Sequence, residues 1–304
     1  MNTAITGVSL LLPGLTDPRG LLRPAVTDGE PVDPAALIGK KGLRYKDRAT
    51  QLGLCMAKAA LTDAGLLGPS GITIPGERVG VVVSTNLGNV DTVCRAVETI
   101  AKEGTAGLSP MDTPNASSNI TASEIAIRFD LRGPNLTVCN GATSGLDAVR
   151  WAALTLRSGR ADRMLVIGVE PENPMTRALV GGPVVDGGAA LVLSRSAEAD
   201  RCRAVLGPAV RAATLADGAG RLADAVPHAG AWVTDHSDVV PEFAARVDLS
   251  GWGECSGALG VMQCAAAVGW ADSGRTDPVC ALTGGHPGAV ASAGLVLRPP
   301  GPSS

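Results

Sequence analysis

The chain has 304 residues, of which 45% are hydrophobic and 18% are charged, and its formal net charge at pH 7 is -3. A chain of this length and composition can bury a large core, so folding needs neither a metal ion nor disulfide bonds. The small net charge, the absence of a Lys/Arg run and an aromatic content of 2% argue against nucleic acid or an anionic membrane as the main partner.

The seven cysteines are scattered and form no CxxC pair. This spacing is typical of reduced thiols packed in a core, and it argues against a zinc site or a disulfide framework. The sequence shows neither a cleavable apolar leader nor an apolar run long enough to cross a membrane. We therefore expect a cytoplasmic protein with no metal ion and no other cofactor.

The first part of the chain alternates strand-like and helix-like segments. A strand is predicted at residues 4–12, an amphipathic helix within residues 43–67 that ends at Gly65, and a buried β-branched strand at residues 78–84. Helices are expected at residues 90–102 and 118–129, and strands at residues 163–168 and 189–194. Strands that alternate with helices favour a layered α/β fold.

The most informative stretch of the sequence is GPNLTVCNGATSGLDAV, residues 133–149. A short strand at residues 135–139 leads through a tight turn at Asn140 and Gly141 into a helix that continues to about residue 157. A strand, a sharp turn and a helix N-terminus together present one small residue to a pocket. That residue is Ala142, which has no nucleophilic atom.

The rest of the chain repeats this alternation in a shorter form. Strands are predicted at residues 204–210, 230–234, 278–283 and 292–297, with helical segments at residues 220–226 and 252–271. The endings ALVLS and GLVLR are a weak internal repeat. The predicted organisation is a first half at residues 1–195, an abridged second half at residues 196–298 and a tail at residues 299–304.

Several blocks, in order, resemble the β-ketoacyl synthase branch of the thiolase superfamily. These are RYKDRATQLGLCMAKAALTDAGL, SPMDTPNASSNITASEIAIRFDLRGPN, the block from GPNLTVCNGATSGLD to MLVIGVE, and DGGAALVL. The likeness is greatest to the subunits of type II polyketide synthases. The resemblance implies a thiolase-like fold of two pseudo-repeated α/β halves in αβαβα layers, with the second half abridged.

The resemblance also implies a Cys-His-His site, and this chain departs from it. The cysteine position falls on Ala142, which cannot form an acyl thioester. The first histidine is matched by His236 in WVTDHSD. The second falls on Glu254 in LSGWGECSGALG, and the lysine of that block falls on Leu249. A carboxylate in place of an imidazole donor would oppose the negative charge that condensation develops.

Four further residues are candidates for the pocket, namely Thr143, Ser144, Gly284 and His286. Thr143 and Ser144 could act as hydroxyl nucleophiles, but hydrogen bonding at the helix N-terminus is the commoner role for such residues. His236 is equally consistent with a vestigial site residue and with a surface loop. His286 is better explained as a loop residue, and Cys139 and Cys255 as small core residues.

The resemblance implies a partner as well as a fold. In this family the strand before the nucleophile forms the subunit interface, and here it comprises Asn135, Leu136, Thr137, Val138 and Cys139. The sequence therefore predicts a catalytically silent, chain-length-factor-like subunit of polyketide or fatty-acid assembly that pairs with an active ketosynthase or with itself and meets an acyl carrier protein. An acyltransferase that uses His236 as a base on carrier-protein or coenzyme A thioesters is the alternative, and a pure scaffold is a third.

Overall fold

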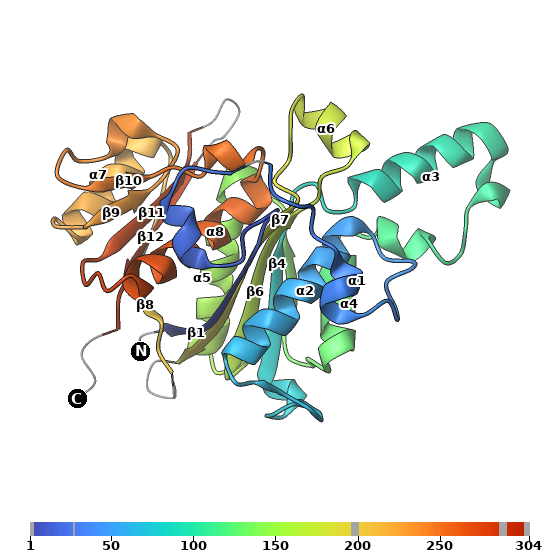
Figure 1. Ribbon diagram of the computed structural model, residues 1–304, viewed down its shortest axis with the longest axis horizontal. Helices are drawn as coiled ribbons and strands as arrows, with labels where there is room; N and C mark the ends of the chain where they lie inside the picture. The colour runs from blue at the N-terminus through green and yellow to red at the C-terminus, as the bar shows by residue number, and fades with distance from the viewer. Residues whose placement is uncertain (1–2, 27, 196–200, 286–290, 301–304) are drawn as a thin grey trace.

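The computed structural model describes residues 3–26, 28–195, 201–285 and 291–300, and it contains a ten-stranded sheet (Figure 1). The strands follow the order β10-β9-β11-β12-β8-β1-β7-β6-β4-β5. Their bounds are β1 (Thr3–Leu11), β4 (Val79–Ser84), β5 (Asn135–Val138), β6 (Arg163–Glu170), β7 (Gly187–Arg195), β8 (Ala204–Ala212), β9 (Ala231–Val233), β10 (Ala245–Val247), β11 (Val279–Gly284) and β12 (Ser292–Arg298). A separate hairpin pairs β2 (Leu67–Gly68) with β3 (Gly71–Ile72).

The sheet consists of two halves with the same topology, which meet where β1 pairs antiparallel with β8. In the first half, β1 pairs antiparallel with β7, β7 antiparallel with β6, and β6, β4 and β5 run parallel. In the second half, β8, β12, β11, β9 and β10 repeat these directions in the same order. The predicted pseudo-repeat is therefore confirmed.

The helices complete five layers. On the first half, α2 (Arg48–Asp63) and α4 (Ile120–Phe129) cover the outer face of the sheet and bury side chains such as Val81 and Leu165. On the second half, α7 (Leu215–Ala225) covers Leu282 and Val296. Between the halves lie α5 (Ser144–Arg157) and α8 (Ser256–Asp272), whose cluster includes the inward-facing side chains of both halves. Because successive strand residues face opposite sides, each central strand contributes side chains to the helical layers on both of its faces.

The shortening of the second half lies in its connections. Residues 12–47 join β1 to α2, whereas residues 213–214 alone join β8 to α7. The first-half connection contains α1 (Pro34–Ile38) and a 3-10 turn, η1 (Pro18–Leu22), which packs on α8. Residues 85–134, which contain α3 (Val90–Glu103) and α4, join β4 to β5, whereas residues 234–244 join β9 to β10. The second half therefore keeps the sheet and loses much of its cover.

Some predicted elements differ from those in the structure. The sequence analysis did not predict β10 or α6 (Pro174–Val180), because three-residue strands and seven-residue helices carry too few residues for a periodic pattern. The predicted helix at residues 252–271 begins later, at Ser256, because Gly253 adopts a φ of 89°. Within the described residues, no helix has the length and apolarity required to cross a bilayer.

The two central helices touch through their backbones. A Cβ atom on Gly260 of α8 would lie 2.2 Å from the backbone nitrogen of Leu146, and one on Gly145 of α5 would lie 2.6 Å from that of Gly260. Real side chains do not reach such distances, so only glycine allows this crossing. The contact fixes the start of α5 against the first turns of α8.

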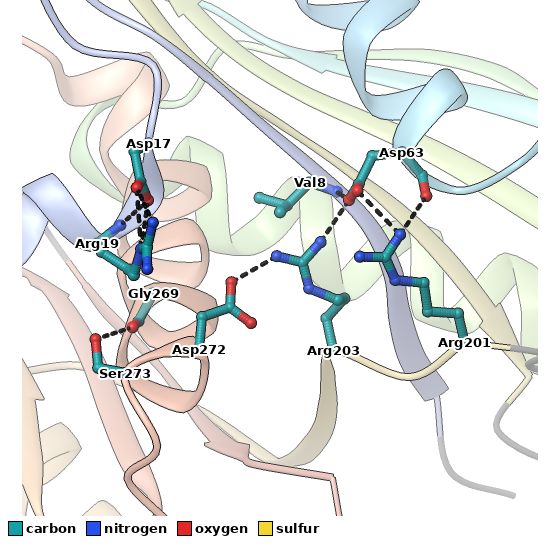
Figure 2. A network of polar contacts seen from close by, with 9 residues as sticks. All are labelled: Val8, Asp17, Arg19, Asp63, Arg201, Arg203, Gly269, Asp272 and Ser273. Carbon is teal, nitrogen blue, oxygen red and sulfur yellow. Dashed lines mark hydrogen bonds and ion pairs between the residues drawn. The ribbon is translucent and has the colours of Figure 1, made fainter.

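An ion network also joins the two halves (Figure 2). Arg203 lies just before β8. Its Nη1 atom donates to Asp63 Oδ2 at the end of α2 at 2.6 Å, and its Nη2 atom donates to Asp272 Oδ2 at the end of α8 at 2.5 Å. The backbone of Val8 in β1 donates to Asp63 as well, and Arg201 forms an ion pair with it. The Arg203 side chain is only 15% exposed, so solvent screens these pairs less than it screens surface ion pairs.

A buried carboxylate holds the ends of several elements together. Glu170, the last residue of β6, is fully buried and accepts hydrogen bonds from the Thr85 hydroxyl and from the backbone N–H groups of Asn86, Leu87 and Gly257. These donors connect the loop after β4 to the start of α8. Burial raises the pKa of Glu170 to about 7, and the four donors act in the opposite direction.

We expect the Gly260→Ala substitution to destabilise the fold by about 3 kcal/mol or more, because the added methyl group would force α5 and α8 apart. The matched control is Gly220→Ala in α7, where the added Cβ would meet no described atom within 4 Å apart from its chain neighbours and its own helix backbone. That variant should gain about 0.5–1 kcal/mol from helix propensity. Urea unfolding measures both free energies, and equal effects would contradict the close crossing.

The raised pKa of Glu170 predicts a pH dependence of stability. The folded protein holds the Glu170 proton more tightly than the unfolded chain does. The contribution of this group to the free energy of unfolding is therefore complete below the ordinary glutamate pKa of 4.5 and falls as pH rises through about 7. The loss should amount to about 1–3 kcal/mol. Glu170→Gln should remove this slope when urea unfolding is followed from pH 5 to pH 8, whereas Glu98→Gln, at an exposed position on α3, should keep it.

Candidate functional site

Ala142 lies where the sequence places it, in the turn between β5 and α5. Residues Gly141–Thr143 form a 3-10 turn, and Gly141 has a φ of 78°, which favours glycine. Ala142 is half-buried, and its carbonyl accepts a hydrogen bond of 3.0 Å from the Thr283 hydroxyl at the end of β11. The turn of the first half is therefore attached to a strand of the second half.

The two hydroxyl groups that follow the turn are both buried and hydrogen-bonded. Thr143 Oγ1 donates to Asp147 Oδ2 at 2.8 Å. Ser144 Oγ accepts from the backbone N–H of Asn140 at 2.7 Å, and the side-chain oxygens of Asn140 and Asn86 lie within reach of its proton. These bonds agree with the helix-terminus role predicted as the commoner one, and they occupy the hydroxyl groups of the two residues that follow Ala142 in the chain.

Asn86, just after β4, connects the turn to α8. Its amide nitrogen donates to the carbonyl of Gly141 at 3.1 Å and to Ser256 Oγ at 2.8 Å, and its side-chain oxygen accepts from the Gly141 N–H at 3.2 Å. Glu254 Oε1 in turn accepts from the backbone N–H of Ser256 at 2.7 Å. Glu254 is thus linked to the Ala142 turn through Ser256 and Asn86.

His236 follows β9 and contacts the end of β11. Its Nε2 atom lies 2.7 Å from the carbonyl oxygen of Gly284, and because a carbonyl only accepts, Nε2 carries the proton in this bond. The side chain is half-buried, so His236 is not a freely exposed loop residue. Gly284 is the neighbour of Thr283, which holds Ala142. His236 therefore lies at the same edge of the sheet as the turn.

The remaining predicted residues divide into three groups. Leu249, at the lysine position, is buried and belongs to the core around α5 and α8. Cys255 is buried as predicted, whereas the prediction that Cys139 is a core residue is wrong, because Cys139 follows edge strand β5 and is exposed. His286 lies outside the described residues.

The sequence analysis missed the residues that hold this arrangement together, namely Asn86, Glu170 and Thr283. Each lies at or just beyond the carboxyl end of a strand, and the ends of β4, β6 and β11 converge near the N-termini of α5 and α8. Polar residues directly after buried strands, as in the runs VVVSTN and VIGVE, were the available signal. In the described part of the chain, no group of three or more His, Cys, Asp or Glu side chains is arranged to hold a metal ion.

β5 is the edge strand of the first half, and one of its two sides is open. Among the described residues, β5 pairs only with β4, and the carbonyl groups of Val138 and Pro134 accept hydrogen bonds from the backbone N–H groups of Thr85 and Val81. Because the N–H and C=O of successive strand residues point to opposite sides, the backbone groups of Thr137 point away from β4. Such a row of free groups is a template for another strand.

Three comparisons relate the chain to known proteins. The family model described as "Beta-ketoacyl synthase, N-terminal domain" matches residues 23–222. Among curated proteins, the chain is 28% identical to the 3-oxoacyl-[acyl-carrier-protein] synthase 2 of Coxiella burnetii over 138 residues, and 30% identical to that of Vibrio harveyi over 139 residues. Each alignment covers 45% of this chain, and the chain spans 33% and 32% of the length of these two relatives.

Solved structures match over almost the whole chain. The ishigamide ketosynthase/chain length factor superposes with a TM-score of 0.77 and 22% identity over 99% of this chain and 100% of the other. A type II polyketide ketosynthase solved with its acyl-carrier protein superposes with a TM-score of 0.78 and 15% identity over 98% of this chain and 99% of the other. At these identities the superpositions establish the thiolase-like fold, and the family model extends over most of the chain. The chain belongs to the β-ketoacyl synthase family.

Proposed function

We propose that this chain is a catalytically silent ketosynthase-like subunit that pairs with an active ketosynthase in polyketide or fatty-acid assembly. The observation that carries the proposal is the composition of the turn at Ala142. The methyl group of Ala142 offers no atom for acyl transfer, and the hydroxyl groups of Thr143 and Ser144 are buried and committed to hydrogen bonds. A condensing enzyme that works through a covalent thioester would lack its first intermediate here.

The other changed positions support the same conclusion. Leu249 is an apolar core residue, so it supplies no cation. Glu254 accepts the N–H of Ser256 and acts as a cap for α8, and it cannot donate a proton to a thioester carbonyl while it is a carboxylate. When several residues act as one catalytic unit, replacing the first of them removes nearly all of the rate enhancement that the unit provides. The later changes would then have cost little.

The open edge of β5 supports the proposed pairing. Leu136 on this strand is 37% exposed, and on α5, which packs behind β5, Trp151 is 54% exposed. α3 extends away from the body of the molecule (Figure 1) and exposes an apolar stripe of Val93, Val97 and Ile100. An unpaired strand beside large exposed apolar side chains fits a protein partner better than it fits solvent.

The relatives suggest the setting of this role. By their names, the curated relatives are 3-oxoacyl-[acyl-carrier-protein] synthases, and one structural neighbour is a ketosynthase/chain length factor. An acyl carrier protein as a transient partner and a location in the cytoplasm are parts of the same proposal.

The alternative role as a cysteine-independent acyltransferase finds less support. His236 would have to act as a base, and its Nε2 atom is not available because it already donates to Gly284, so only Nδ1 could take up a proton. If His236→Ala abolished acyl transfer from a coenzyme A thioester, this alternative would replace our proposal.

The edge of β5 provides a direct test of pairing. In Thr137→Pro, the ring removes a backbone N–H that points to the open edge and leaves the bonds between β4 and β5 in place. We expect the amount of co-purified ketosynthase to fall about tenfold or more, since loss of strand pairing costs more than 1 kcal/mol. The measurement is co-expression with an active type II polyketide ketosynthase, followed by affinity purification.

Thr137→Val is the matched control, because it keeps the N–H and changes only the side chain, and it should co-purify like the unchanged protein. Thermal unfolding of each variant alone checks that the fold survives. Unchanged pairing in a folded Thr137→Pro variant would move the interface away from β5. A chain that stays monomeric beside the ketosynthase and changes neither its yield nor its product would refute the proposed function.

Restoring the thiol tests the proposed silence. Ala142→Cys should remain without condensation activity, because Leu249 and Glu254 still supply neither a cation nor a proton donor to the developing oxyanion. The assay is product formation from acyl and malonyl carrier-protein thioesters, with Ala142→Ser as the control. Condensation by Ala142→Cys alone would show a working site around the turn and contradict our proposal.

A further inference from the structure

A groove with a volume of about 620 Å³ lies away from the Ala142 turn, between α5 and strands β8 and β12. Its lining is polar and apolar in similar measure, and the apolar part, here called the apolar floor, contains Leu146, Val149, Ala153, Leu154, Leu206 and Leu295. The volume is within the range of sites that bind ligands or short peptide segments. The groove extends along α5, from the region of Asp147 to that of Arg157.

The pseudo-repeat explains why this space exists. In the first half, η1 follows β1 and packs on α8, where Leu21 is fully buried and Pro18 lies against Gly269. In the second half, the corresponding connection after β8 consists of residues 213–214 and continues directly into α7. Among the described residues, therefore, no turn covers the side of α5 that corresponds to the η1-covered side of α8.

Basic side chains line this uncovered space. Arg150 and Arg157 come from α5 and Arg211 from the end of β8, whereas the Arg298 side chain lies with Val296 on the opposite face of β12. Arg211 forms an ion pair of 3.1 Å with Asp147. Within the described residues, no ion pair joins Arg150 or Arg157 to a carboxylate. The groove thus combines an apolar floor with two guanidinium groups that form no ion pair there, and guanidinium groups bind carboxylates with two parallel hydrogen bonds.

We propose that this groove binds a short acidic segment of a partner polypeptide, with one or two leucine-like side chains on the apolar floor and carboxylates at the arginines. The segment takes the place that η1 has on α8, but it is not a copy of η1. Counted from the first residue of each helix, Arg157 of α5 corresponds to Gly269 of α8, where η1 makes its closest approach. A bulky cation in place of glycine favours an occupant that stays farther from the helix and carries negative charge.

This inference is independent of the proposed pairing at β5, because it concerns a different face of α5 and requires only the groove. The probe is a fluorescein-labelled peptide, TDPEGLLEP, which is residues 16–24 with both arginines replaced by glutamate. The unaltered peptide TDPRGLLRP, which keeps both arginines, tests whether binding requires negative charge. The peptide TDPEGSSEP, in which serines replace both leucines, tests whether binding requires the apolar side chains. Fluorescence anisotropy with the full chain gives the dissociation constants.

We expect TDPEGLLEP to bind saturably and about tenfold or more tightly than either comparison peptide, and to weaken in about 0.5 M NaCl. Arg150→Glu/Arg157→Glu should weaken binding by a similar factor, because it reverses two charges at exposed positions. The matched control is Arg160→Glu, an exposed arginine just beyond α5 that does not line the groove, and its affinity should not change. Circular dichroism verifies that each variant is folded.

Three outcomes would overturn the proposal. The first is absence of saturable binding, or binding that the double variant leaves unchanged. The second is complete displacement of the peptide by millimolar inorganic phosphate, which would identify a simple anion site. The third is a dimer in analytical ultracentrifugation that Arg150→Glu/Arg157→Glu dissociates, which would make a second copy of this chain the occupant.

Discussion

The backbone contact between α5 and α8 is the constraint on which the rest of the structure depends. Each half contributes one of these helices, and each helix begins at the edge where the strands of its half end. Gly145 and Gly260 let the helices cross with no side chain between them. The two N-termini are therefore fixed relative to each other, and the turn at Ala142 and the cap at Glu254 come together even though they lie far apart in the sequence.

The polar connections around this crossing do not require a nucleophile. Asn86 binds Gly141 and Ser256, and Glu170 binds Gly257 and the loop after β4, so the turn and both helices are held by groups other than the Ala142 side chain. This arrangement gives a physical reason why the fold tolerates alanine at this position. Charge and packing around Ala142 can then change without unfolding the protein.

The sequence predicted the elements that have a clear hydrophobic periodicity or turn pattern. Prediction failed where the structure depends on contacts between residues far apart in the chain. The β-branched run of β4 and the turn at Gly141 predicted their own conformation, and the resemblance implied the layers. The exposure of Cys139 could not be predicted, because an apolar strand at the edge of a sheet has the same sequence pattern as one in the centre. The role of Glu170 was also missed, because its four donors come from two separate segments.

The asymmetry between the halves links the turn to the groove. The same topology is covered by long connections in the first half and by short ones in the second, so equivalent faces of α8 and α5 differ in exposure. On α8, η1 fills the space and packs against Gly269. On α5, Arg150 and Arg157 border the open space. A face left open merely by a deletion would expose the apolar residues that its lost cover once buried, and it would gain no charge of one sign. Two arginines of α5 beside one apolar floor are better explained by an external acidic partner than by an unfilled gap.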